Sequence, residues 1–108
     1  MMKSYRFFIL LLIMSLATAC AEEKHKYVIG VSQCSDDEWR HQLNAELMRE
    51  MAFHPEVKME IVTAYGSNEK QISDIEEFIR RQVDVIIVAP NEADPITPDV
   101  EKAYDTGL

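Results

Sequence analysis

The sequence has few glycines and few basic residues, and each shortage removes a class of function. Only three glycines occur in 108 residues, and they form no glycine-rich turn after the first expected strand, which excludes a dinucleotide-binding site. The 11 basic residues are outnumbered by 19 acidic ones, so the net charge is −8. Because nucleic-acid binding needs a basic patch that neutralises phosphates, we expect no nucleic-acid partner.

Cysteine is also scarce, since Cys20 and Cys34 are the only two. If Cys20 is removed or lipidated with the amino-terminal segment, Cys34 is left alone and no disulfide framework can form within the chain. A nucleophilic Cys34 would need a base beside it, and the spacing of the three histidines suggests none. The carboxylates show no metal-ligand spacing. We therefore expect no catalytic residue, no metal and no cofactor.

Residues 1 to 20 have the features of a signal peptide. Two basic residues near the start precede an unbroken apolar run over residues 7–14, and small residues follow up to Cys20. The run is far shorter than the roughly 20 residues that a spanning helix needs. The last four residues resemble a lipobox with alanine in place of the usual leucine, so lipidation of Cys20 and ordinary cleavage after Ala19 are both open. We expect an exported, periplasmic protein, with residues 21–26 as a charged leader.

Three segments predict strands. Residues 83–91 are almost continuously apolar and β-branched until Pro90, which is typical of a strand covered on both faces in a parallel sheet. Residues 27–32 show the same character. Residues 57–61 alternate between apolar and charged side chains, which indicates a strand nearer an edge.

Helical spacing separates these strands. Trp39, Leu43, Leu47 and Met51 recur at every fourth residue and predict one apolar stripe on a helix that runs to about residue 53. A second helix is expected to bury a face made of Ile72, Ile75, Phe78 and Ile79.

Residues at the expected helix ends suggest where the second and third helices begin. Asn68 followed by Gln71 predicts a capping box at the start of the second. Thr97 before Pro98 predicts the start of the third, and Gly107 its end.

The order strand, helix, strand, helix, strand, helix predicts an α/β fold. Right-handed crossovers with the edge-like strand outermost give a three-layer, doubly wound parallel sheet of strand order 2-1-3. The third strand is then left with an open apolar edge. We therefore expect residues 27–108 to be part of a longer lobe, continuing beyond Leu108.

In this order the loops after the first and third strands face each other across the topological switch point, where ligands bind. The first loop carries Ser32, Asp36, Trp39 and Arg40, and the second carries Asn91. Hydroxyl, carboxylate, amide, guanidinium and indole groups suit a sugar. The alternative interpretation is that the acids of residues 36–38 are charges at a helix N-terminus, and that Trp39, which lies on the apolar stripe, belongs to the core. For Trp39 the core interpretation is favoured.

Five segments resemble, in order and spacing, the amino-terminal lobe of the ribose-type periplasmic sugar-binding proteins, a type I periplasmic binding protein fold. They are residues 27–33, 39–40, 71 with 75–79, 83–90 and 103–107. The resemblance implies that Ser32, Asp36, Trp39 and Arg40 contact a small sugar, held against a second lobe beyond Leu108.

The run from residue 32 to residue 40 most resembles the periplasmic sensor of hybrid two-component histidine kinases. Such a parent implies a kinase part absent from this chain, which itself is not an enzyme. The alternative is a solute-binding lipoprotein of a sugar ABC transporter. Contact with a membrane is then expected only through a lipid anchor or a downstream spanning segment.

Two proteins of related topology are disfavoured. A response-regulator receiver needs a phosphorylatable aspartate after its third strand, where Ala89, Pro90 and Asn91 stand here. A repressor built on the same lobe would begin with a helix-turn-helix, and this chain begins with a signal-like segment.

Overall fold

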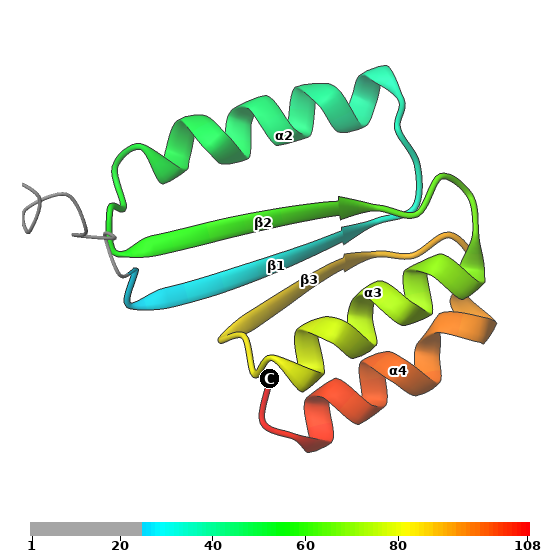
Figure 1. The fold of residues 1–108 in the computed structure, drawn as a ribbon. Coiled ribbons are helices and arrows are strands. Elements are labelled where there is room, and N and C mark those ends of the chain that lie inside the picture. The colour runs from blue at the N-terminus through cyan, green and yellow to red at the C-terminus, as the bar shows by residue number, and fades with distance from the viewer. Residues whose placement is uncertain (1–24) are drawn as a thin grey trace, which may run out of the picture.

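The computed structural model describes residues 25–108, so the expected signal peptide, Cys20 and most of the charged leader lie outside the described residues. Strands and helices alternate through this range (Figure 1). They are β1 (Tyr27–Gln33), α2 (Glu38–Met51), β2 (Val57–Thr63), α3 (Asn68–Arg80), β3 (Val85–Ala89) and α4 (Ala93–Asp105). Within residues 25–108, no helix is both long and apolar enough to cross a membrane.

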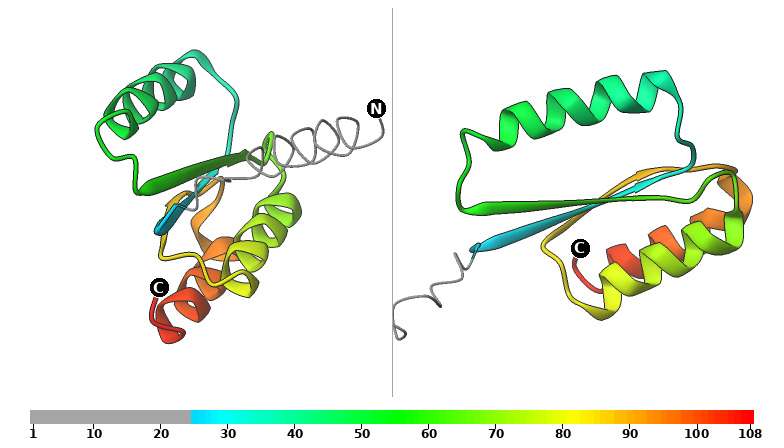
Figure 2. Two further views of the ribbon diagram at one scale, coloured as in Figure 1. Left: turned by 60° about the vertical axis from the view of Figure 1, so that its left-hand side comes forward. Right: turned by 45° about the horizontal axis from the view of Figure 1, so that its top comes forward.

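The three strands form one parallel sheet in the order β2-β1-β3, which confirms the predicted order 2-1-3. Helix α2 lies on one face, and α3 and α4 lie side by side on the other (Figures 1 and 2). The predicted three-layer α/β fold is therefore confirmed. Parallel strands bring their carboxyl ends to a single edge of the sheet, and the loops after β1, β2 and β3 all leave the sheet there.

Helix α3 packs closely against β1. Gly30 of β1 is buried, and Phe78 and Ile75 of α3 are only 2% and 0% exposed. Ile72 and Ile79 of the predicted face are half-buried. A Cβ atom at Gly30 would lie 2.7–2.8 Å from three ring atoms of Phe78, so the absence of a side chain lets α3 approach the sheet this closely.

Helix α2 packs more loosely than its sequence predicts, because none of its residues is buried. Leu47 and Met51 are half-buried, whereas Leu43 is 36% exposed and Trp39 69% exposed. At about 100° per residue, each step of four advances roughly 40° around the helix, so Trp39 and Met51 cannot face the same surface. The prediction of one buried stripe, with Trp39 in the core, is therefore wrong.

Strand β3 is shorter and more exposed than the predicted strand over residues 83–91. It covers Val85–Ala89, and Val85 and Ile87 are 45% and 42% exposed. In the parallel register these two residues stand beside Ile29 and Val31 of β1. They therefore point to the α2 side of the sheet, where α2 extends along β2 and does not cover them (Figure 1). Within residues 25–108, the expectation that both faces are covered is wrong.

Helix α3 begins one residue earlier than the predicted capping box. Ser67 is the N-cap, and its hydroxyl accepts a 3.1 Å hydrogen bond from the Lys70 backbone N–H. Asn68 is already helical, and Gln71 points into the protein, where it is fully buried. The Gln71 side chain therefore does not cap the helix, and its amide is available for hydrogen bonds inside the protein.

Helix α4 begins at Ala93, five residues before Pro98. Pro95 fits because the first backbone N–H groups of a helix have no partner within it. Pro98 lies inside the helix, and Thr97, the predicted N-cap, donates its hydroxyl to the Ala93 carbonyl oxygen at 2.8 Å. The predicted end is confirmed, because Gly107 has φ +88° just after the helix.

An ion pair joins the outer strand to the end of α3. Both guanidinium nitrogens Nη1 and Nη2 of Arg81 donate to Glu60 of β2, at 2.6 and 2.8 Å, and Lys58 contacts the same carboxylate at 2.8 Å. Arg81, with Lys58 second, lowers the pKa of Glu60 to about 2 from 4.5. A carboxyl group whose pKa falls on folding stabilises the protein above its unfolded pKa and loses that contribution as the pH falls.

We predict that stability falls between about pH 5 and pH 2, with about 1 kcal/mol of the loss due to Glu60. Glu60→Gln should remove this part of the acid dependence, measured as the free energy of urea unfolding against pH. Glu77→Gln is the comparison, because Arg80 also lowers the pKa of Glu77, but this pair lies on the exposed surface of α3 and should change the acid dependence less. If the free energy of unfolding depends on pH in the same way for wild type and Glu60→Gln, Glu60 is not the cause of the acid-dependent loss.

Candidate functional site

Three loops meet at the carboxyl edge of the sheet, and the loop after β2 lies between the other two. The Gly66 backbone N–H donates to the Cys34 carbonyl oxygen at 2.7 Å, which ties this loop to the one after β1. The Asn91 side chain donates to the Gly66 carbonyl oxygen at 3.1 Å and to Asn68 Oδ1 at 2.8 Å, which ties it to the loop after β3. The loops after β1 and β3, which are predicted to face each other, are thus connected through Gly66.

Gln71 lies beneath these loops and joins β1, β3 and the β3–α4 loop. Its Nε2 atom donates to the Ala89 carbonyl oxygen at 2.9 Å and to Ser32 Oγ at 3.2 Å, and its Oε1 atom accepts from the Asn91 backbone N–H at 2.8 Å. Ser32 and Gln71 are both 0% exposed. Ser32, a predicted contact residue, therefore supports the site from beneath and has no surface to offer a ligand in this lobe.

The acids after β1 have separate roles. Asp37 is the N-cap of α2, where it accepts from the Arg40 backbone N–H at 2.9 Å and from Ser35 Oγ at 2.7 Å; these bonds lower its pKa. The interpretation of residues 36–38 as helix N-terminal charges is therefore correct for Asp37 and for Glu38, which lies in the first turn of α2. Asp36 contacts His41 Nε2 at 2.7 Å, and this pairing raises the pKa of His41.

Arg40 lies between the loop and the first turns of α2, half-buried. Its Nη2 atom is 3.5 Å from Cys34 Sγ, and its buried Nε atom has no hydrogen-bond partner among residues 25–108. Burial raises the pKa of the Cys34 thiol, but hydrogen bonds with Ser35 and Arg40 outweigh it and leave that pKa below its ordinary value. The guanidinium thus makes one weak contact with a thiol and retains donors for another partner.

Trp39 stands beside Arg40 in the first turn of α2 and exposes 69% of its surface. An exposed indole offers a flat apolar face, on which the C–H face of a sugar can pack. Apart from the buried Ser32, the predicted residues lie in two places. Asp36, Trp39 and Arg40 are together on one loop and helix start, and Asn91 is linked to them through Gly66.

Sequence reasoning missed Gln71, His41 and Asn68 as parts of this region. The spacing of Asn68 and Gln71 predicts a capping box, although a glutamine among apolar residues at helical spacing also fits a buried amide. The pairing of Asp36 with His41 has no helical spacing, because Asp36 precedes the helix. These roles depend on how the three loops are placed by the sheet.

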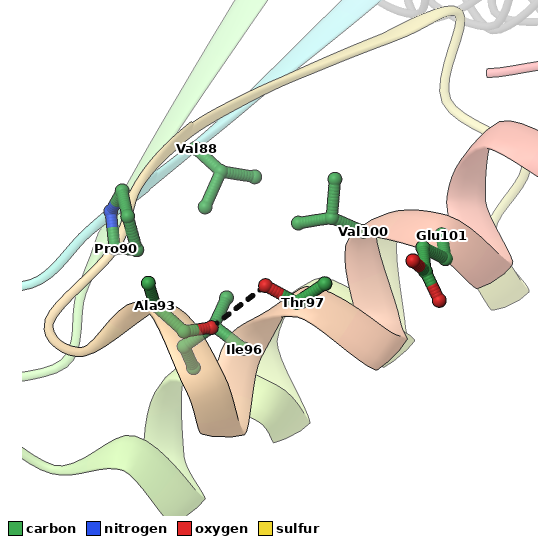
Figure 3. A pocket seen from close by; sticks show the side chains of 7 residues that line it. All are labelled: Val88, Pro90, Ala93, Ile96, Thr97, Val100 and Glu101. Atoms are coloured by element: carbon green, nitrogen blue, oxygen red, sulfur yellow. Dashed lines mark hydrogen bonds between the residues drawn. The ribbon is translucent and has the colours of Figure 1, made fainter.

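A separate hollow of about 290 Å³ lies between β3 and α4. It is lined mainly by apolar side chains, including Val88, Ile96 and Val100 (Figure 3). None of the predicted sugar contacts lines it. Within residues 25–108, no group of three histidine, cysteine or acidic side chains is arranged to hold a metal ion.

Solved structures include close matches to this fold. The fructose-binding periplasmic domain of hybrid two-component system BT1754 is 48% identical, with a TM-score of 0.74 over 76% of this chain and 27% of that one. An ABC transporter solute-binding protein from Bacillus halodurans, with bound myo-inositol, is 28% identical, with a TM-score of 0.73 over 82% of this chain and 31% of that one.

The arabinose-binding protein of an ABC transporter from Shewanella sp., bound to L-arabinofuranose, has a TM-score of 0.67 at 24% identity, over 75% of this chain and 27% of that one, and supports the fold alone. No family model matches the sequence, and no curated protein matches it. The chain spans between about a quarter and a third of the length of these structures. The fold and these matches together show that residues 25–108 have the structure of one lobe of a periplasmic sugar-binding protein.

Proposed function

We propose that this chain recognises a small sugar as one lobe of a periplasmic sensor of the hybrid two-component histidine kinase type. The observation that carries the proposal is the 48% identity with the fructose-binding periplasmic domain over 76% of the chain. A second lobe of the full-length protein would close over the ligand. Export through residues 1 to 20, with or without lipidation of Cys20, belongs to the same proposal.

A solute-binding lipoprotein of a sugar ABC transporter is the second candidate. It is favoured by the lipobox-like sequence before Cys20 and by the fold shared with several transport receptors. The coding sequence after residue 108 separates the two. A second lobe followed by a spanning helix and a kinase module indicates a sensor, and a second lobe that is followed by a stop codon indicates a transport receptor.

The proposed contacts are Asp36, Trp39, Arg40 and Asn91, with Ser32 beneath them. A carboxylate and a guanidinium can pair with adjacent hydroxyl groups, and the indole can cover the less polar face of the ring. Acids surround Arg40 along the chain, at residues 36–38. We therefore expect a neutral sugar rather than a phosphorylated or carboxylated one.

Titration calorimetry on the full-length exported protein tests the function. Fructose is the first ligand to try, followed by arabinose, glucose, allose and myo-inositol. One neutral sugar should bind at a one-to-one ratio with higher affinity than its phosphate ester. Absence of heat with every sugar of the panel would refute the proposal.

We predict that Trp39→Ala weakens binding of the best sugar by about 1–2 kcal/mol and leaves the free energy of unfolding nearly unchanged. The reason is that an indole 69% exposed contributes little to the core but offers a stacking surface. Calorimetry and urea unfolding measure the two effects. Phe53→Ala is the matched control, because Phe53 is 75% exposed and follows the other end of α2. A large loss of stability with unchanged affinity would contradict the stacking role.

A further inference from the structure

The hydrogen bonds around Asn91 fix the orientation of its side-chain amide. The Gly66 backbone carbonyl can only accept a hydrogen bond, so the atom 3.1 Å from it must be the amide nitrogen. The second hydrogen of that nitrogen is used by Asn68 Oδ1 at 2.8 Å. With both donors occupied, the amide has only its carbonyl oxygen left, and this oxygen has no protein donor among residues 25–108.

Gln71 fixes the backbone of the same residue from below. Its own orientation is determined by two backbone groups: the Ala89 carbonyl accepts from Nε2, and the Asn91 N–H donates to Oε1. A buried amide that satisfies groups on two strands and a loop holds them rigidly, because any shift would leave a polar group unpaired. The whole chain of bonds runs from Ser32 through Gln71 to Asn91 and then to Gly66.

We propose that Gln71 is a positioning residue that holds Asn91 so that only its carbonyl oxygen faces the ligand, which makes Asn91 selective for a hydroxyl donor at one position of the sugar. This inference rests on the proposed function and deepens it. Gln71 itself is buried and touches no ligand. Its effect on recognition passes through the backbone of Asn91.

The experiment compares Gln71→Met with Gln33→Met in the full-length protein. Gln33 is the matched control, because it is also a buried glutamine, 2% exposed, at the end of β1, and its amide pairs with Asn44 on the opposite face of the sheet. Each variant is measured for unfolding, for hydrogen exchange at the Asn91 backbone amide, and for binding of the best sugar and its singly deoxygenated analogues.

We expect Gln71→Met to speed exchange at Asn91 and to weaken sugar binding, each about tenfold. Wild type should lose affinity when one particular hydroxyl is removed, and Gln71→Met should no longer discriminate at that hydroxyl. Gln33→Met should keep the exchange rate and the discrimination of wild type. If exchange at Asn91 is faster while affinity and discrimination are unchanged, the role in recognition is refuted.

Two further outcomes would overturn the proposal. Unchanged exchange at Asn91 in Gln71→Met would show that Gln71 does not hold that residue. If wild type binds no sugar, the proposed function fails, and with it the role of Asn91 toward a ligand. The exchange measurement then still decides whether Gln71 positions the loop, so the two failures are distinguishable.

Discussion

Gly30→Ala should lower the free energy of unfolding by about 1–3 kcal/mol, although alanine is ordinarily the better residue in a strand. The added Cβ would lie 2.7–2.8 Å from three ring atoms of Phe78, well inside normal contact distance. Phe78 is 2% exposed where α3 faces the sheet, so its ring can move away only by displacing the atoms packed around it. The gain of up to about 1 kcal/mol from replacing a flexible glycine is smaller than this steric cost.

Urea unfolding of four proteins tests this prediction: wild type, Gly30→Ala, Phe78→Leu and the double variant. Leucine lacks the ring that the new methyl group would strike, so Gly30→Ala should cost much less in the Phe78→Leu background. The two substitutions touch the same space, and their effects should therefore not add. An equal cost of Gly30→Ala in both backgrounds would show that the Phe78 ring is not the cause.

The sheet was predictable because its strands differ in their apolar pattern. The alternation in residues 57–61 marked an edge, the continuous run before Pro90 marked a strand of a parallel sheet, and these two features with right-handed crossovers gave the observed order. What the pattern could not give was how far α2 covers the sheet. The exposure of Val85, Ile87 and Trp39 depends on where α2 lies over the sheet. The spacing of apolar residues along the sequence does not determine that position.

Helix starts were less predictable because several residues could serve as caps. Ser67 and Asn68 are adjacent and both favour a cap, and the backbone selects Ser67. In α4, Pro98 suggested a first helical position, but the helix tolerates Pro95 in its first turn and includes Pro98 further on. Proline thus indicated a helix nearby but not the residue at which it begins.

For the candidate site, too, the sequence predicted the general location but not the individual contacts. Topology predicted that the residues after β1 and β3 belong to one edge, and the structure places them there. It could not predict that Ser32 is buried under Gln71, or that Gly66 mediates the contact between the two loops. Those details follow from how three loops pack, and they change the expected role of Ser32 from contact to support.

Arg40→Ala should weaken binding of the best sugar by about 2–3 kcal/mol, which is roughly a 30- to 150-fold loss of affinity. Its guanidinium is half-buried, one nitrogen makes only a 3.5 Å contact with Cys34 Sγ, and the buried Nε has no partner among residues 25–108. The terminal guanidinium nitrogens keep donors that Cys34 does not use, and these can serve sugar hydroxyls in a closed site, whereas the Nε atom is covered by protein. Loss of a charged donor from such a site costs more than loss of an exposed one.

Arg40→Lys should restore only part of the affinity, because an ammonium group cannot reproduce the planar fork that pairs with two adjacent hydroxyls. Arg49→Ala is the matched control, since Arg49 is on the same helix and, among residues 25–108, its side chain pairs only with Glu46 on the exposed surface. Calorimetry should give wild-type affinity for Arg49→Ala. Unfolding of Arg40→Ala should stay within about 0.5 kcal/mol of wild type, because the Arg40 side chain makes only a weak contact with Cys34 among residues 25–108, and alanine keeps the backbone hydrogen bond to Asp37. An unchanged sugar affinity in Arg40→Ala would place the binding site elsewhere on the lobe, even with the fold as described.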